Sequence, residues 1–212
     1  MSDAWTNIRG RSLINFLVNN PKGTVFLKTI DASNMVKDAD LIFHLIDVVE
    51  EVGEDIVVQV VTDNASAYKA AGRLLMEKRK HLYWTPCAAY CIDLILKDLG
   101  KLNEHKKALF KANKVSNYIY NHGWILALMK EHTKCEIIRP ATTRFATAFL
   151  TLQSIYQSKD ALEMMFVSDK WKSSTYFKKK EGKEIKHIVL QDKYFWPSVV
   201  YAIKTTQPLV NV

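Results

Sequence analysis

An aspartate that follows a valine-rich segment is the side chain in this sequence best placed for chemistry. Asp63 comes directly after residues 57–62, which read VVQVVT and predict a buried strand, because branching at Cβ suits an extended backbone. α/β folds place their chemistry at the carboxyl ends of such strands, and hard cations such as Mg²⁺ take oxygen ligands. Asp63 is therefore a candidate metal ligand. The competing interpretation is a turn carboxylate ahead of a helix that Asn64 or Ser66 caps.

A lysine-rich segment in the second half of the chain is another candidate site. Residues 170–186 hold seven lysines, among them Lys178, Lys179 and Lys180, and three aromatic residues are interleaved with them. Lysines neutralise nucleic-acid phosphates and exposed aromatic rings stack on bases, so this pattern suits nucleic-acid binding. The alternative is a solvated loop, since two glutamates dilute the positive charge.

Charge is spread unevenly along the 212 residues. Residues 1–106 hold 13 Lys+Arg and 14 Asp+Glu, whereas residues 107–212 hold 17 and 8, so the formal net charge of +8 belongs to the second half. A basic half is consistent with a polyanionic partner but does not identify one.

The composition also excludes several classes of protein. With 48% hydrophobic and 25% charged residues, the chain is expected to form one sizeable globular domain, or one domain and part of another. No run of about 18 apolar residues is present, so no membrane span is expected, and the N-terminus lacks the pattern of a secretory signal. Three cysteines, Cys87, Cys91 and Cys135, are sparse and odd in number, which suits a reducing compartment.

Hydrophobic periodicity predicts alternating strands and helices up to about residue 100. Strands are predicted at 13–18, 24–30, 57–62 and 82–84, and helices at 36–52, 66–80 and 86–100, with a hairpin turn over 19–23. Beyond residue 100 only helices are predicted, at 102–130, 144–168 and 193–206. A hairpin followed by βαβ units implies a mixed sheet with flanking helices. The predicted class is thus α/β for residues 1–125, followed by a helical region over residues 126–212.

Five segments of the sequence together resemble one protein family. They read DAWTN at 3–7, RSLINF at 11–16, VVTDNAS at 60–66, WTPCAAYCIDL at 84–94 and RPATTRF at 139–145. In this order they resemble the plant hAT-type transposases, in particular the conserved domain of formerly unknown function that forms the front of their catalytic core. The resemblance spans nearly the whole chain.

The resemblance implies a ribonuclease-H-like fold interrupted by a large helical insertion. In that fold three acidic residues bind two Mg²⁺ ions about 4 Å apart, which polarise the phosphate and generate the attacking oxygen. The motif match makes Asp3, on the first strand, the first acid and Asp63 the second. The resemblance also implies a nuclear location, and it places Arg144 and the adjacent Phe145 near the active site and DNA.

Departures from the family argue against catalysis. The chain begins two residues before Asp3, so we expect most of its strand to be missing and Asp3 to be a frayed terminal residue. No convincing third acid follows, because Glu163, Glu181 and Glu184 have no strand context. Tyr90 also stands where the family motif has histidine.

We therefore expect a truncated hAT-type transposase derivative without enzymatic activity. It combines a partial ribonuclease-H-like mixed sheet and its flanking helices with the start of the helical insertion. Asp3 and Asp63 are then the remains of an incomplete Mg²⁺ site, and no cofactor is expected. Expected partners are DNA, or another transposase-like chain, and not a membrane; the expected location is the nucleus, with the cytoplasm as the alternative. Two other interpretations remain open: an active metal-dependent transposase or nuclease, and the non-functional product of a decaying transposon copy.

Overall fold

The chain forms two compact units, Met1–Cys91 and Ile92–Val212, which we call the sheet unit and the helical unit. The computed structural model describes residues 1–34, 39–133, 136–141 and 144–210 and, within the helix at 39–52, the side chains of residues 44, 45 and 47–52. The predicted helix start at residue 36, Cys135, and Thr142 and Thr143 of the family motif lie outside the described residues.

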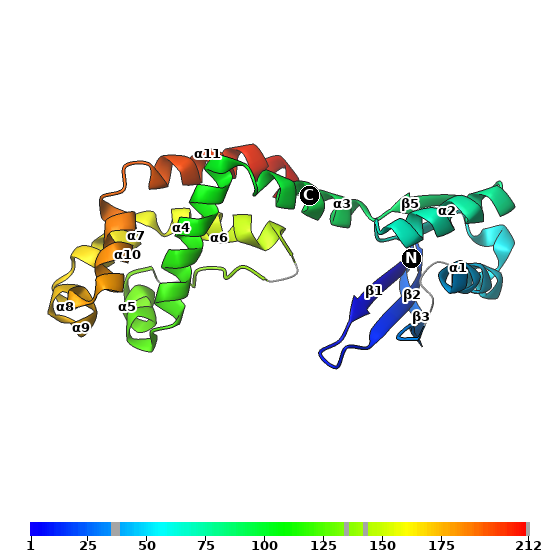
Figure 1. Cartoon of the computed structure of the whole chain (residues 1–212), viewed down its shortest axis with the longest axis horizontal. Coiled ribbons are helices and arrows are strands. Elements are labelled where there is room, and N and C mark those ends of the chain that lie inside the picture. Colours follow the sequence, from blue (N-terminus) through cyan, green and yellow to red (C-terminus); the bar gives the residue numbers. More distant parts are fainter. Residues whose placement is uncertain (35–38, 134–135, 142–143, 211–212) are drawn as a thin grey trace. The chain divides into compact units, whose positions relative to one another are not determined.

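The strands of the sheet unit form two small sheets (Figure 1). An antiparallel meander consists of β1 (Ser2–Thr6), β2 (Ser12–Asn20) and β3 (Gly23–Asp31), and β4 (Gln59–Thr62) runs parallel to β5 (Tyr83–Pro86). β1 and β4 approach each other, but the described residues form no hydrogen-bonded ladder between them. The predicted α/β class is confirmed, with all four predicted strands present and a fifth, β1, before them.

The hairpin between β2 and β3 forms where the sequence predicts it. Asn20 pairs with Gly23 at its end, and the Asn20 side chain accepts a hydrogen bond from the Lys22 N–H (2.8 Å). Gly23 has a φ of 147°, a backbone conformation that glycine adopts without a steric penalty. The register shifts between Phe16 and Leu17, so β3 carries one extra residue there as a bulge.

β1 corrects the prediction that Asp3 is a frayed terminal residue. The strand pairs with β2 from Ser2↔Phe16 to Thr6↔Ser12, and Met1 and Leu17 exchange two main-chain hydrogen bonds of 2.8 and 2.9 Å. Ser2 is only 2% exposed. Ladder bonds and burial thus hold the strand in place, because each paired residue satisfies backbone groups that would otherwise need water.

The core of the sheet unit lies between its strands and two helices. These helices are α1 (Ala39–Val52), which the short 3₁₀ turn Glu54–Ile56 follows, and α2 (Ser66–Lys78). The described buried core consists of Ile14, Phe16, Leu45, Val49, Val60, Tyr68, Ala71, Leu75 and Leu82. Arg79, at the end of α2, ties the helices together through ion pairs with Glu50 (2.7 Å) and Glu54 (2.8 Å). α3 (Ala88–Leu99) then runs across the boundary into the helical unit.

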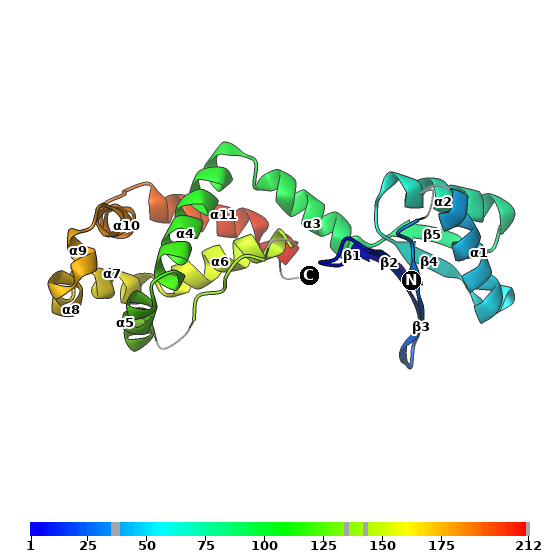
Figure 2. The ribbon, with the colours of Figure 1, turned by 60° about the horizontal axis from the view of Figure 1, so that its bottom comes forward.

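The helical unit is built from helices packed across one another. They are α4 (Asn103–Tyr120), α5 (Gly123–Thr133), α6 (Ala146–Gln157), α7 (Lys159–Val167), α8 (Asp169–Ser173), α9 (Thr175–Lys178), α10 (Lys180–Leu190) and α11 (Phe195–Val210). α4 packs against α6, α11, α5 and α10, and Figures 1 and 2 both show it crossing α6 and α11. None of the described helices combines the length and the apolar composition needed to cross a bilayer.

The prediction of a solvated loop over residues 170–186 is wrong. That segment forms α8, α9 and the first part of α10, and Trp171 is fully buried with its ring 4.8 Å from that of Phe166 in an edge-to-face contact. Ser168 and Ser174 begin the two short helices, and each side chain accepts a backbone N–H bond from the third residue on. Serine caps and one deeply buried aromatic ring therefore outweigh the high lysine content.

The boundary between the compact units lies earlier than residue 125. The sequence places a boundary there because the strand pattern fades, whereas the units separate at 91/92 because α4 packs with the helices that follow it. The boundary at 125 describes a change in the sequence pattern, and the boundary at 91/92 describes packing. The assignment of 1–125 and 126–212 to separate domains stays a prediction.

Candidate functional site

Asp63 lies at the carboxyl end of β4, between the strand and α2. The preceding Thr62 is fully buried and its hydroxyl accepts a hydrogen bond from the Trp84 indole N–H (3.0 Å), which fixes the end of the strand. The Asp63 Oδ1 accepts a hydrogen bond from the Ala65 N–H (2.8 Å). Neither Asn64 nor Ser66 caps α2, since its N-cap residue is Ala65 and no side chain caps the helix. Asp63 therefore both follows the end of a strand and stabilises the turn into α2. The two interpretations from the sequence do not exclude each other.

The structure brings Asp3 and Asp63 together. Asp3 is exposed on β1, opposite Asn15 of β2, and β1 approaches β4. Burial raises the pKa of Asp63 above its ordinary value, the hydrogen bond from Ala65 opposes that shift, and the negative charge of Asp3 raises the pKa further. Two carboxylates that repel each other hold a cation or share a proton more readily than isolated carboxylates do.

Two buried hydroxyl groups lie beside this acidic pair. The hydroxyls of Ser2 and Tyr68 are buried, and neither meets the geometry of a hydrogen bond. Burial raises the pKa of Tyr68, the nearby Ser2 hydroxyl lowers it, and the charges of Asp63 and Asp3 add to the rise. These donors and the two carboxylates form a small polar cluster at one end of the sheet unit.

A pocket of about 320 Å³ opens next to Asp63 and Tyr68. Its remaining walls come mainly from β1 and β2, including Ala4 and Ile14, and are largely apolar. The exposed ring of Trp5 stands at its edge. The polar residues of its lining are Asp63 and Tyr68, together with Thr6 and Ser12.

The donor set does not fit a two-metal centre. Within residues 1–34, 39–133, 136–141 and 144–210, no group of three His, Cys, Asp or Glu side chains is placed to hold a metal ion. The glutamates considered as a third acid belong to the helical unit, where Glu163 pairs with Lys159 and Glu184 with Lys114. Two divalent ions held by two carboxylates would keep a net charge of about +2 in need of compensation. We therefore assign no metal-dependent step to this site.

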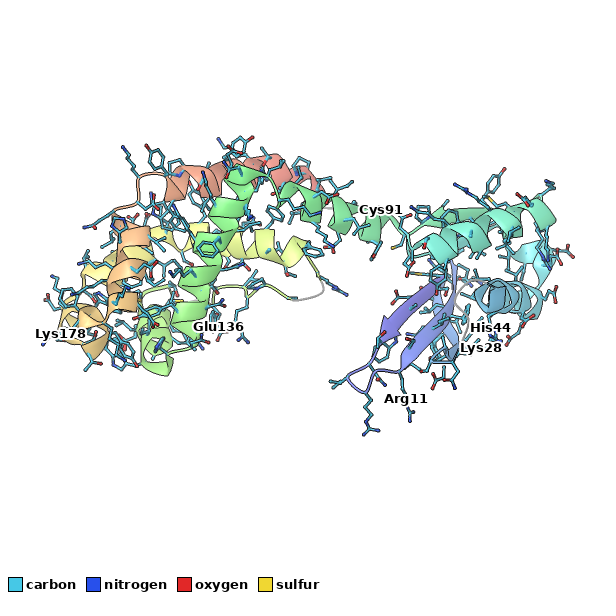
Figure 3. The ribbon with its side chains drawn as sticks, in the orientation of Figure 1. Arg11, Lys28, His44, Cys91, Glu136 and Lys178 are labelled. Atoms are coloured by element: carbon cyan, nitrogen blue, oxygen red, sulfur yellow. The ribbon has the colours of Figure 1, made fainter. Side chains whose placement is uncertain are left out.

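The three consecutive lysines Lys178, Lys179 and Lys180 are exposed where α9 gives way to α10. Lys178 is seen at the end of the helical unit that carries α8 and α9 (Figure 3). The ammonium of Lys179 lies 4.8 Å from the centre of the Tyr176 ring. Within the described part of the chain, none of the three forms an ion pair. Their charge is therefore available to an anionic partner.

Sequence reasoning missed an aromatic cluster beside these lysines. Tyr176 stacks on Trp124 at 5.7 Å between ring centres, and His122 contacts both Tyr176 (5.1 Å) and Tyr118 (4.7 Å). The Tyr118 hydroxyl is buried and has no hydrogen-bond partner among the described residues. Burial, followed by the charge of Glu181, raises the pKa of Tyr118 to about 12. The two contacts of Tyr176 join residues more than 50 positions apart in the sequence, so no local pattern predicts them.

The structure does not bring Arg144 to the lysines. Arg144 is exposed just before α6, which begins at the end of the helical unit away from α9 (Figures 1 and 2). The adjacent Phe145 ring is half exposed and lies 5.0 Å from the Lys97 ammonium. Arg144 and Lys178–Lys180 are thus two separate basic positions on one unit.

Cys87 and Cys91 lie four residues apart at the start of α3, and both thiols are free and partly buried.

Comparison with known proteins identifies one family. The sequence model of a domain of unknown function, DUF659, matches residues 1–115. That family is found in hAT-like plant transposases. No curated protein matches the chain.

Proposed function

This chain belongs to the DUF659 family, and on that premise we propose that it is a transposase-related module that binds nucleic acid and does not cleave it. The helical unit supplies the binding surface, and the acidic pair of the sheet unit is the remnant of a catalytic site. The proposal places the protein in the nucleus, with DNA and a second transposase-like chain as partners. The observation that carries it is the exposed run Lys178–Lys180, which forms no ion pair with the described residues, on a unit rich in positive charge.

Strand order supports a ribonuclease-H-like origin of the sheet unit. The meander β1–β2–β3 and the parallel pair β4–β5 become one mixed sheet of order 3-2-1-4-5 if β1 and β4 complete a ladder. β1 and β4 are already neighbours, and Asp3 and Asp63 lie where those two strands approach. Proximity of an acid on the first strand to an acid after the fourth is what the family fold requires.

The number of ligands around that pair supports the proposed absence of cleavage. In the described residues only Asp3 and Asp63 meet there, and no third acid joins them. Two-metal catalysis depends on ions that clamp both the attacking and the leaving oxygen. Without enough carboxylates, the ions are bound weakly and the clamp is not held.

The charge and the exposed surface of the helical unit support the proposed nucleic-acid binding. Residues 92–212 hold 20 Lys+Arg and 11 Asp+Glu, and the lysines at 178–180 stand next to the exposed edge of the Trp124–Tyr176 stack. Lysines bind phosphates by releasing counterions from the nucleic acid, and aromatic rings accept unpaired bases. A single-stranded segment therefore suits this surface better than a duplex.

Fluorescence anisotropy with a labelled single-stranded DNA tests binding. Replacing Lys178, Lys179 and Lys180 with alanine should weaken binding and reduce the slope of log K against log salt by about 2, since each lost phosphate contact on a single strand changes the slope by roughly 0.7.

The matched control replaces Lys106, Lys107 and Lys204 with alanine. These lysines are exposed on the same unit, form no ion pair among the described residues, and change the net charge by the same amount. If both triple variants lose affinity equally, binding reflects overall charge and the assigned surface is wrong. Affinity that does not change up to about 0.2 M salt would contradict phosphate contact altogether.

A nicking assay tests the second half of the proposal. Supercoiled plasmid incubated with the protein and Mg²⁺ or Mn²⁺ should remain intact, and the Asp63→Asn variant should give the same result. Nicking by the original protein that disappears in Asp63→Asn would instead establish an active metal-dependent nuclease. If the protein neither binds nor cleaves nucleic acid, the interpretation as a non-functional transposon product stands.

A further inference from the structure

A pocket of about 310 Å³ lies between α4 and α10 in the helical unit. The two helices pack against each other (Figure 1). One wall of the pocket comes from the C-terminal half of α4 and the two residues that follow it, and the other from the first turns of α10. No described residue outside these elements lines it. Its polar lining consists of Lys114, Tyr118, Asn121, His122, Glu181 and Glu184.

The Tyr118 hydroxyl is a buried donor without an acceptor. The side chain is 7% exposed, and its hydroxyl has no hydrogen-bond partner among the described residues. A methyl added at Gly182 would lie 2.9 Å from the hydroxyl oxygen, which places this group against the first turn of α10, where Glu181 lies. Because the pKa of Tyr118 is raised to about 12, the hydroxyl keeps its proton at neutral pH. An unpaired buried donor costs free energy that an acceptor on a ligand would recover.

Two acceptors also line the pocket. The Glu181 carboxylate forms no ion pair with the described residues, whereas Glu184 is paired with Lys114. The His122 Nδ1 donates a hydrogen bond to the main-chain oxygen of Tyr118 (2.8 Å), so the Nε2 of the neutral ring is an acceptor. The lining thus combines a carboxylate, a ring nitrogen and a hydroxyl donor whose hydrogen-bonding capacity is left for a ligand.

The pocket adjoins the surface proposed to bind nucleic acid. The His122 ring contacts the rings of both Tyr118 and Tyr176, and Tyr176 stacks on Trp124. The run Lys178–Lys180 leads directly into Glu181 at the start of α10. A single strand whose phosphates lie on these lysines therefore has both the aromatic stack and the pocket within reach of its bases.

We propose that this pocket binds a guanine base of the single strand. The inference rests on the proposed nucleic-acid binding and names the base that the same surface selects. Guanine carries two adjacent donors, N1–H and N2–H, beside the acceptor O6. The Glu181 carboxylate accepts both donors in parallel, as a carboxylate does from a guanidinium group, and the Tyr118 hydroxyl donates to O6. Unpaired bases are read in this way along their Watson–Crick edges.

Other occupants match this set of groups less well. Adenine and cytosine present one amino donor beside a ring nitrogen acceptor, and thymine presents one N–H between two carbonyls, so each turns an acceptor toward Glu181. A phosphate would meet the charge of the same carboxylate. A cationic side chain of a partner protein would be repelled by the surrounding lysines, which attract nucleic acid. Among the described residues no three metal-ligating side chains gather here.

Fluorescence anisotropy with oligothymidine strands that differ at one central base tests the proposal. A strand with guanine at that position should bind at least about fivefold more tightly than the strand with thymine, since a bidentate base contact discriminates by at least this factor. Hypoxanthine in place of guanine lacks only the 2-amino group and should lose most of the preference. The 7-deaza analogue keeps both donors and O6, so it should retain the preference.

Three variants locate the preference in the pocket. Glu181→Gln should abolish it, because an amide cannot accept two parallel N–H bonds at one site. Tyr118→Phe should weaken it about threefold, and thermal unfolding should show that the fold is kept, since only an unpaired hydroxyl is lost. The control Glu104→Gln, at the other end of α4, changes the net charge as Glu181→Gln does and should leave the preference unchanged.

The two proposals fail in different ways. Equal affinity for the guanine and thymine strands would overturn the pocket assignment and leave the proposed nucleic-acid binding intact, whereas no binding of either strand would overturn both. A preference that survives Glu181→Gln would also overturn the assignment. Nuclear magnetic resonance signals of the His122 ring give a direct readout, and the guanine strand should shift them. If arginine amide shifts them and the guanine strand does not, a cationic side chain of a partner protein is the occupant.

Discussion

The sheet unit and the helical unit differ in how completely they close around their cores. In the helical unit, Trp171, Phe195 and Phe166 are fully buried among helices that pack across one another. In the sheet unit, Phe16 is buried yet borders an open groove of about 470 Å³ between β2 and β4. The two units also differ in charge. Residues 1–91 hold 10 Lys+Arg and 11 Asp+Glu, whereas residues 92–212 hold 20 Lys+Arg and 11 Asp+Glu.

The two units differ in the size of the core rather than in the sequence distance between contacting residues. The sheet core joins β2 to β4 across about 45 residues, and the helical core joins α4 to α11 across about 90. Among the described residues, 23 buried hydrophobic residues form the helical core and nine form the sheet core. The helical unit therefore buries more apolar surface, which stabilises it. The candidate acids sit on the less closed unit, and the basic surface sits on the better packed one.

The largest expected effect comes from opening the helical core. Trp171→Ala should lower the free energy of unfolding of the helical unit by about 3–5 kcal/mol, since it removes a fully buried ring and its contact with Phe166. Denaturant unfolding followed by circular dichroism measures the loss. The control is Phe110→Ala, on a 67% exposed ring of α4, which should change little. Similar losses in both variants would show that the helical core is not closed around Trp171.

A smaller effect compares one glycine from each unit. An added methyl at Gly182 would lie 2.1 Å from the carbonyl oxygen of Tyr176, and at Gly72 it would lie 2.2 Å from the Trp84 ring. A main-chain carbonyl moves less readily than a partly exposed ring, so Gly182→Ala should cost more, about 1–3 kcal/mol. Thermal unfolding of both variants measures which substitution lowers the stability more.

Gly123→Ala is the control for that pair, because no atom lies within 4 Å of the added methyl. It should be neutral or slightly stabilising, since alanine favours a helix over glycine. A larger cost at Gly72 than at Gly182 would reverse the comparison and make the sheet unit the more rigid one.

The smallest expected effect concerns the acidic pair. The pKa of Asp63 is raised in the folded protein, so its ionised form is less favourable there than in the unfolded chain. Asp63→Asn should therefore raise the free energy of unfolding at pH 7 by less than about 1 kcal/mol, because the group is only partly buried. The gain should shrink as the pH falls toward the ordinary aspartate value of 3.8, where the native carboxyl is already protonated.

Urea unfolding at pH 7 and near pH 4 measures that gain. Adding Asp3→Asn should contribute less once Asp63 is neutral, since the charge of Asp3 raises the pKa of Asp63. A gain that is the same at both pH values would mean that the pKa of Asp63 is not raised in the folded protein. Full additivity of the two substitutions would mean that the two carboxylates do not interact.

Most elements of the fold could be predicted from local patterns. The hairpin over β2 and β3, the valine strand β4 and the helix α2 after it form where periodicity and turn residues place them. The lysine-rich segment was misjudged, because lysine content hid two serine caps and the buried Trp171. Composition over a window says little about one side chain that fills a core.

The candidate functional residues were likewise only partly predictable from the sequence. Asp63 at the end of a core strand could be predicted from residues 57–66 alone. The separation of Arg144 from the lysines, and the stack of Trp124 on Tyr176, could not be predicted, since they depend on how helices far apart in sequence cross.

By itself the sequence determined most of the strands and helices, that one half is basic, and that the chain carries the DUF659 motifs, because each of these is a property of neighbouring residues. Only the tertiary structure decided that β1 is held in a ladder, that Asp3 raises the pKa of Asp63, and that a groove remains between β2 and β4. Those features arise from contacts between residues distant in the chain, and no local preference specifies the register or the gaps that such contacts leave.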